Sequence, residues 1–172
     1  MKYQDVIDKI YKGDLSKVPS LLLCIDPGET TGYAVFEKAQ LLEYGQIETI
    51  TSEGEPRWRY LHELFRNIKP DYVVCEDYRV YGHKLERHAN SKVVTLRLIG
   101  GLDFMCWNDE RSPEETLLSI PIHYQMAAQA KGFVTDQRLK DWGFWKEGMK
   151  HSRDAIRHGL YFLVITNRPK GD

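Results

Sequence analysis

Four residues suited to acid–base or metal chemistry stand at the ends of predicted elements: Asp26, Glu76, His151 and Asp154. Asp26 ends the apolar run of residues 21–25, and Glu76 ends a second apolar run. Fully apolar runs of this length are typical of strands buried in a sheet. If the two strands are parallel neighbours, both carboxylates lie on one rim of the sheet, where α/β proteins bind their ligands.

Two carboxylates this close repel each other and favour a cation between them. Mg²⁺ is a natural partner because it takes oxygen ligands. His151 and Asp154 lie three residues apart on a predicted helix and therefore share a face. If that helix begins over the rim, three acids and one imidazole can hold two ions about 4 Å apart, an arrangement that hydrolyses phosphodiesters in line.

Each of the four residues also has an ordinary structural interpretation, which is the commoner one for a residue taken singly. Asp26 before Pro27-Gly28 can initiate a turn. Glu76 can be a solvated strand end, and His151 and Asp154 can be residues of a helix start. The combination of two strands that end in acids with a helical His-x-x-Asp favours a site.

The elements that must position these residues follow from the apolar periodicity. Helices are expected over residues 1–19, 57–68, 90–107 and 151–165, and short helices and turns over 124–150. Strands are expected over residues 21–25, 32–36, 40–50, 71–75 and 117–123, with a hairpin turn at Glu37-Lys38. Gly100-Gly101 would let its helix lie close to a neighbouring backbone. This order predicts an α/β fold with a central mixed five-stranded sheet flanked by helices.

Composition excludes several classes of protein. The 172 residues suit one compact domain, and no apolar run approaches the roughly 20 residues of a membrane span. No signal peptide is evident, so we expect a cytoplasmic protein. The three cysteines, Cys24, Cys75 and Cys106, lie in apolar stretches without a CxxC pair, which favours buried thiols over a zinc site.

Charge is unevenly distributed along the chain. The net charge is −1, yet residues 79–97 and 131–153 are locally basic. A basic face can bind phosphate while the total stays near zero, although a solvated charged surface gives the same pattern. Residues 78–89 are polar, basic and aromatic, which is typical of an exposed loop.

Three motifs resemble RuvC-like Holliday junction resolvases. Residues 25–35 (IDPGETTGYAV) resemble that family's opening strand and turn, and Val73-Val74-Cys75-Glu76 resembles its second acidic strand. His151-Ser152-Arg153-Asp154-Ala155 resembles its terminal helix motif. Together with residues 131–136 (KGFVTD), this last motif looks most like the shortened bacteriophage versions. The resemblance covers about residues 21–165.

The resemblance implies a ribonuclease H-like nuclease domain over residues 20–172, preceded by a helical extension over 1–19. It implies that Asp26, Glu76 and Asp154 ligate Mg²⁺ or Mn²⁺, with two ions expected, and that His151 takes the fourth position. It also implies a homodimer that cuts four-way DNA junctions, in the cytoplasm of a bacterial host if the protein is phage-encoded. The residues expected to contact DNA are Tyr78, Arg79, Tyr81, Lys84, Arg87 and Lys131.

Other functions stay open at this point. The substrate can be branched DNA in general, including flaps, and the two tyrosines can simply pack within their loop. An inactive ribonuclease H-like domain that binds DNA or a protein partner is a second hypothesis. A nucleotide-binding actin-like domain is a third, since such domains also begin with a strand, an aspartate and a glycine turn.

Overall fold

A five-stranded mixed sheet forms the centre of the computed structural model, which describes residues 1–78, 93–108 and 119–169. The strands are β1 (Leu21–Asp26), β2 (Thr30–Glu37), β3 (Gln40–Glu48), β4 (Tyr72–Asp77) and β5 (Ile122–Met126). Their order is β3-β2-β1-β4-β5, with β1, β2 and β3 antiparallel and with β4 and β5 parallel to β1. The predicted α/β fold class and mixed sheet are confirmed.

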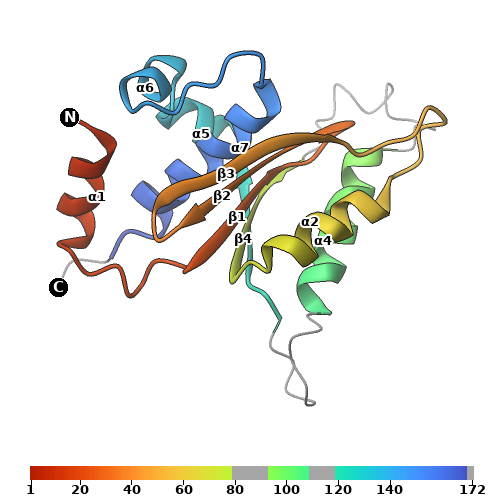
Figure 1. The fold of residues 1–172 in the computed structure, drawn as a ribbon, viewed down its shortest axis with the longest axis horizontal. Coiled ribbons are helices and arrows are strands. Elements are labelled where there is room, and N and C mark those ends of the chain that lie inside the picture. The colour runs from red at the N-terminus through yellow and green to blue at the C-terminus, as the bar shows by residue number, and fades with distance from the viewer. Residues whose placement is uncertain (79–92, 109–118, 170–172) are drawn as a thin grey trace.

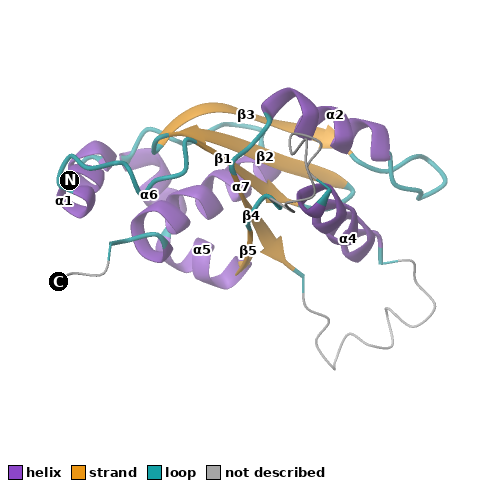
Figure 2. Cartoon of the chain, turned by 90° about the horizontal axis from the view of Figure 1, so that it is seen from below, coloured by secondary structure: helices purple, strands orange, loops and turns teal. Residues whose placement is uncertain are grey.

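Helices cover both faces of this sheet (Figures 1 and 2). They are α1 (Tyr3–Tyr11), α2 (Trp58–Ile68), α4 (Val94–Trp107), α5 (Ala127–Phe133), α6 (Asp136–Asp141) and α7 (Lys150–Tyr161), which continues into the π-helical η2 (Phe162–Thr166). One face carries α1, α5, α6 and α7, and the other carries α2 and α4. Among the described residues, no helix is long and apolar enough to cross a membrane.

The apolar runs of β1 and β4 are explained by burial on both faces. Successive side chains of a strand point to opposite faces. In β1, Leu22 and Cys24 therefore pack toward α7, while Leu23 and Ile25 pack toward α2 and α4. All four are fully buried. The three cysteines are buried, as the sequence predicts.

The hairpin turn between β2 and β3 lies one residue later than expected. Glu37 still pairs with Gln40, so the turn residues are Lys38 and Ala39, at φ values of 43° and 72°. Two successive positive φ values match the right-handed twist of a tight hairpin. Because neither residue is Gly or Asn, the sequence carries no clear signal for this turn.

Other boundaries also differ from expectation. The N-terminal helix, expected over residues 1–19, ends at Tyr11, where Lys12 and Gly13 take positive φ values. The sequence predicts the last strand over residues 117–123, of which 117–118 lie outside the described residues. It runs instead from Ile122 to Met126, because its pairing partner is β4 and the register places Gln125 opposite Glu76. The final helix begins at Lys150, close to the prediction, but changes from α to π geometry at Phe162.

The N-terminal helix α1 shares the hydrophobic cluster that lies between the sheet and α7. Tyr3, Ile7 and Tyr11 are buried. The hydroxyl of Tyr3 donates to the Ala39 carbonyl oxygen at 2.9 Å, and that of Tyr11 donates to the Leu163 carbonyl oxygen at 2.6 Å. The predicted helical extension therefore contacts both the β2–β3 turn and η2.

The close approach to a neighbouring backbone that is expected at Gly100-Gly101 is absent, and Gly101 instead lies against a side chain. A Cβ atom there would lie 2.4 Å from the Trp58 ring of α2, whereas one at Gly100 would meet nothing within 4 Å. Gly101 therefore lets α4 pack tightly against α2.

Candidate active site

The first two acids lie side by side at one rim of the sheet. β1 and β4 are parallel neighbours, with Ile25 opposite Cys75. Asp26 and Glu76 are the next residues on the two strands and therefore lie beside each other. Asp26 and Glu76 lie two residues after Cys24 and Val74, which pack toward α7. Side chains two residues apart on a strand point to the same face of the sheet. Both carboxylates therefore belong to the face that α7 covers.

The start of α7 is fixed over this rim by contacts with β2 and β3. A Cβ atom on Gly32 would lie 2.0 Å from the His151 carbonyl oxygen, so only glycine permits this approach. The Ser152 hydroxyl donates to the Gly45 carbonyl oxygen at 2.6 Å, and the His151 backbone N–H donates to Gln46 Oε1 at 2.9 Å. These contacts bring His151 and Asp154 to the two strand-end acids.

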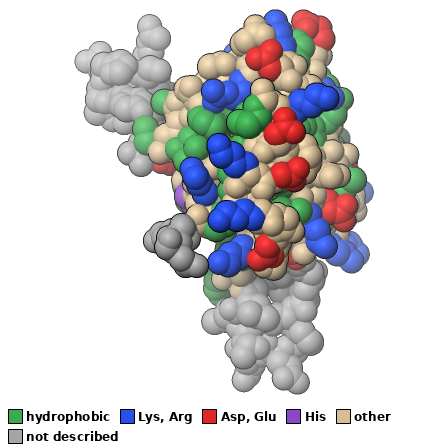
Figure 3. Space-filling model, turned by 90° about the vertical axis from the view of Figure 1, so that its left-hand side faces the viewer, with side chains coloured by type: hydrophobic (Ala, Val, Ile, Leu, Met, Phe, Trp, Pro, Cys, Tyr) green, Lys and Arg blue, Asp and Glu red, His purple; other side chains and the backbone are tan. Residues whose placement is uncertain are grey.

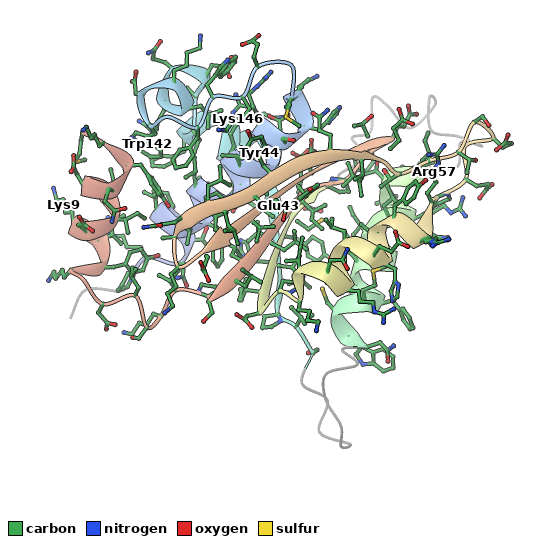
Figure 4. All side chains as sticks on the ribbon, in the orientation of Figure 1. Lys9, Glu43, Tyr44, Arg57, Trp142 and Lys146 are labelled. Atoms are coloured by element: carbon green, nitrogen blue, oxygen red, sulfur yellow. The ribbon has the colours of Figure 1, made fainter. Side chains whose placement is uncertain are left out.

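The segment that leads into α7 is also held against β3. The Lys146 ammonium lies over the ring of Tyr44, 4.6 Å from its centroid (Figure 4). A cation over an aromatic ring at this distance is attracted by the ring's negative face. The contact helps to fix the approach of the chain to Lys150.

Asp26 is buried and contacts His151. Its side chain is 12% exposed, and Oδ2 lies 3.0 Å from His151 Nδ1. Burial, together with the negative charges of Glu76 and Asp154, raises the pKa of Asp26 to about 6, although the hydrogen bond and charge of His151 act in the opposite direction. Three carboxylates therefore act on one another at this rim.

Asp154 is paired with two basic side chains. Its carboxylate accepts from Arg157 on the same helix, and Oδ2 lies 3.1 Å from Lys131 Nζ on α5. Burial lowers the pKa of Lys131, but the charges of Asp154, Glu76 and Asp26 outweigh it, so the pKa is raised overall. One ammonium thus interacts with all three carboxylates.

Arg157 connects the site to the segment after α5. It is buried, pairs with Asp136, and donates from Nε to the Val134 carbonyl oxygen at 3.0 Å. A guanidinium that bridges two acids and a carbonyl is held in one orientation. Arg157 therefore fixes Asp154 relative to α6.

Glu76 is held by a residue that sequence analysis missed. His158 on α7 is fully buried, and its Nε2 lies 2.9 Å from Glu76 Oε2. His151, Asp154 and His158 are spaced three and four residues apart, which places them on one helix face. That spacing was the available signal for His158.

The donor set suits a hard divalent cation. Mg²⁺ and Mn²⁺ prefer carboxylate oxygens, and three carboxylates lie near enough to Lys131 for their charges to raise its pKa. Within the described ranges, no three acids, histidines or cysteines are grouped closely enough to form a ready metal cage. The acids are instead paired with His151, His158, Lys131 and Arg157, and a metal would compete with these pairs.

The structure describes only some of the residues that are expected to contact DNA. Arg79, Tyr81, Lys84 and Arg87 lie outside the described residues, while Tyr78 directly follows β4 and is half-buried. Lys131 lies in the site itself, at Asp154. On the face around α1 and α6, basic and acidic side chains are interspersed (Figure 3).

Comparison with known proteins gives structural matches only. No protein-family model matches the sequence, and no curated protein matches it. Thermus thermophilus RuvC in complex with a Holliday junction substrate matches with a TM-score of 0.59 at 16% identity, over 85% of this chain and 94% of that chain. A second Thermus thermophilus RuvC structure matches with a TM-score of 0.48 at 17% identity, over 86% of this chain and 98% of that one. The chain has the ribonuclease H-like fold of RuvC.

Proposed function

We propose that this protein is a metal-dependent endonuclease that cleaves phosphodiesters in four-way or other branched DNA. The observation that carries the proposal is the convergence of Asp26, Glu76 and Asp154 on one rim of a RuvC-like fold. Burial of Asp26 beside two other acids is unfavourable without a cation, and such perturbed carboxylates cluster at functional sites.

Asp26, Glu76 and Asp154 would hold Mg²⁺ or Mn²⁺, with two ions expected, and His151 completes the set. When bound, such ions activate water and stabilise the leaving oxygen of an in-line displacement. His151 donates to or accepts from Asp26 and is 38% exposed, so it can orient that carboxylate and also reach a phosphate oxygen. Lys131, once released from Asp154, supplies a positive charge for the DNA backbone.

A homodimer would place two such sites on a four-way junction with matching symmetry. An apolar surface on α2 and α4 supports this part of the proposal. Trp58, Phe104 and Trp107 are 40%, 58% and 55% exposed there. Exposed aromatic side chains that gather in this way are typical of protein interfaces. Light scattering after gel filtration would measure the oligomeric state, and Phe104→Glu should shift a dimer toward monomer.

The first test is cleavage of a synthetic four-way junction beside a matched duplex, with and without Mg²⁺ or Mn²⁺. Paired symmetric nicks that need metal and disappear in Asp26→Asn would support a junction resolvase. Cutting of flaps and other branched forms would keep the site and broaden the substrate. DNA binding without cutting under either metal would favour the inactive binding domain, and ATP binding would favour the actin-like hypothesis. The bacteriophage-type assignment stays a prediction.

A further inference from the structure

A buried chain of hydrogen bonds extends behind Glu76 into the protein. His158 and Gln125 are 0% and 1% exposed. His158 Nε2 lies 2.9 Å from Glu76 Oε2, and Gln125 Nε2 lies 2.8 Å from His158 Nδ1. The chemistry proposed above assigns no role to either residue.

The direction of these hydrogen bonds follows from the contacts of Gln125. Its amide nitrogen also lies 3.3 Å from the His158 carbonyl oxygen, which can only accept. The amide nitrogen therefore faces α7 and donates to Nδ1. The ring N–H of His158 is then at Nε2, from which it donates to Glu76.

The burial of Gln125 at this position is energetically unfavourable unless the hydrogen bonds of its amide nitrogen serve a purpose. Its Oε1 is buried without a hydrogen-bond partner among the described residues. An unpaired buried acceptor costs about 1–3 kcal/mol, which an apolar side chain would avoid. Gln125 lies directly opposite Glu76 in the β4–β5 register, so the strand pairing fixes its distance from the carboxylate.

We propose that His158 and Gln125 are positioning residues that hold Glu76 ready for a divalent cation, an inference that rests on the proposed function. Gln125 fixes the ring of His158, and His158 fixes Oε2 of Glu76. The second oxygen of the carboxylate, Oε1, would then be left to ligate the metal. Partners of this kind orient metal ligands, and their removal typically weakens metal binding about 10–100-fold.

The test compares two substitutions of His158 in the full chain. In His158→Gln, the side-chain amide can still donate to Glu76 from a similar position, whereas His158→Leu fills the space without a donor. Affinity for Mn²⁺ alone is measured by calorimetry without DNA, and the Mg²⁺ concentration for half-maximal junction cleavage is measured separately. We expect His158→Leu to weaken both about 10–100-fold, and His158→Gln to restore most of the loss. Gln125→Leu should weaken both in the same direction.

His123→Leu is the matched control. His123 lies two residues before Gln125 on β5, is half-buried, and packs against Phe162 with ring centroids 5.7 Å apart. This variant should leave Mn²⁺ affinity unchanged. Thermal unfolding without metal then separates loss of fold from loss of metal binding.

The outcomes distinguish this inference from the proposed function. If the wild type binds Mn²⁺ and cleaves, but folded His158→Leu binds Mn²⁺ as tightly, the positioning role is wrong and the nuclease stands. Equal losses in His158→Leu and His158→Gln would also overturn it, because the donated hydrogen bond then has no effect. If the wild type neither binds Mn²⁺ nor cuts DNA, the proposed function falls and this inference with it.

Discussion

Replacement of Asp26 by asparagine should stabilise the metal-free protein while it abolishes cleavage. Burial, together with Glu76 and Asp154, raises the pKa of Asp26 from its ordinary value of 3.8 to about 6. The folded protein therefore binds a proton at Asp26 more tightly than the unfolded chain, and its stability falls as pH rises from about 4 to above 6. At about 1.4 kcal/mol per tenfold change in proton binding, the ionised carboxylate costs about 3 kcal/mol at pH 7.5.

Asparagine has nearly the same shape and carries no charge. In EDTA at pH 7.5, Asp26→Asn should therefore be about 3 kcal/mol more stable than the wild type, which is about 6–12 °C in Tm for a chain of this size. At pH 4 the gain should shrink to about 0.5 kcal/mol, because Asp26 is then protonated in the folded wild type.

The assay is thermal and chemical unfolding at both pH values, with the exposed Asp8→Asn as a control that should change little at either. Added Mg²⁺ should raise the Tm of the wild type and not that of Asp26→Asn. A variant that is less stable than the wild type at pH 7.5 without metal would refute the reasoning. In that case the His151 contact would stabilise the carboxylate more than burial and repulsion destabilise it.

Three other substitutions test the surroundings of the site. Gly32→Ala would place a Cβ atom 2.0 Å from the His151 carbonyl oxygen. We expect denaturant unfolding to show about 1–3 kcal/mol of destabilisation, and junction cleavage to be lost. An active, stable variant would contradict the close approach. Lys131→Met is measured for junction binding in a cleavage-inactive background. If the Lys131 ammonium contacts one phosphate, the slope of the logarithm of the binding constant against the logarithm of salt concentration should become shallower by about 0.9. An unchanged slope would exclude that contact. Tyr11→Phe removes the 2.6 Å hydrogen bond to the Leu163 carbonyl oxygen and should lower unfolding free energy by about 1–3 kcal/mol, with cleavage per folded molecule unchanged.

The strands of the sheet could be predicted where burial on both faces gives them an entirely apolar sequence. β1 and β4 are covered on both faces, so each is a short apolar run that ends abruptly at an acid. The start of β5 was misplaced because no alternation marks it, and only pairing with β4 defines where it begins. The hairpin turn was shifted because Lys38 and Ala39 take positive φ values that residues of their type seldom show.

The acids of the candidate site were predictable for a related reason. Asp26 and Glu76 interrupt apolar strands, and Asp154 follows His151 by one helical turn, so local patterns pointed to them. The spacing of His158 places it on the same helix face as His151 and Asp154, but its partners and those of Lys131 were not predictable, because each contact depends on how one helix packs against another part of the chain. Lys131 was expected at the DNA backbone, and the structure places its ammonium 3.1 Å from Asp154.

The site depends on the rotation of one helix about its axis. α7 packs across β1, β2, β3 and β4, and its His158 also contacts Gln125 on β5. His151 and His158, seven residues apart on the same helix face, reach the acids of β1 and β4 respectively. A rotation by one residue, about 100°, would turn both histidines and Asp154 away from the sheet.

Two glycines set this rotation. A Cβ atom on Gly32 would meet the His151 backbone at 2.0 Å, and one on Gly159 would meet the ring of Phe36 at 2.2 Å and Cys24 Sγ at 2.9 Å. α7 is therefore pressed against β2 near its first turn and against β1 and β2 near its last. Because both ends are fixed by close packing, the polar groups between them are held without a flexible loop, which is how a precise metal-binding arrangement is best supported.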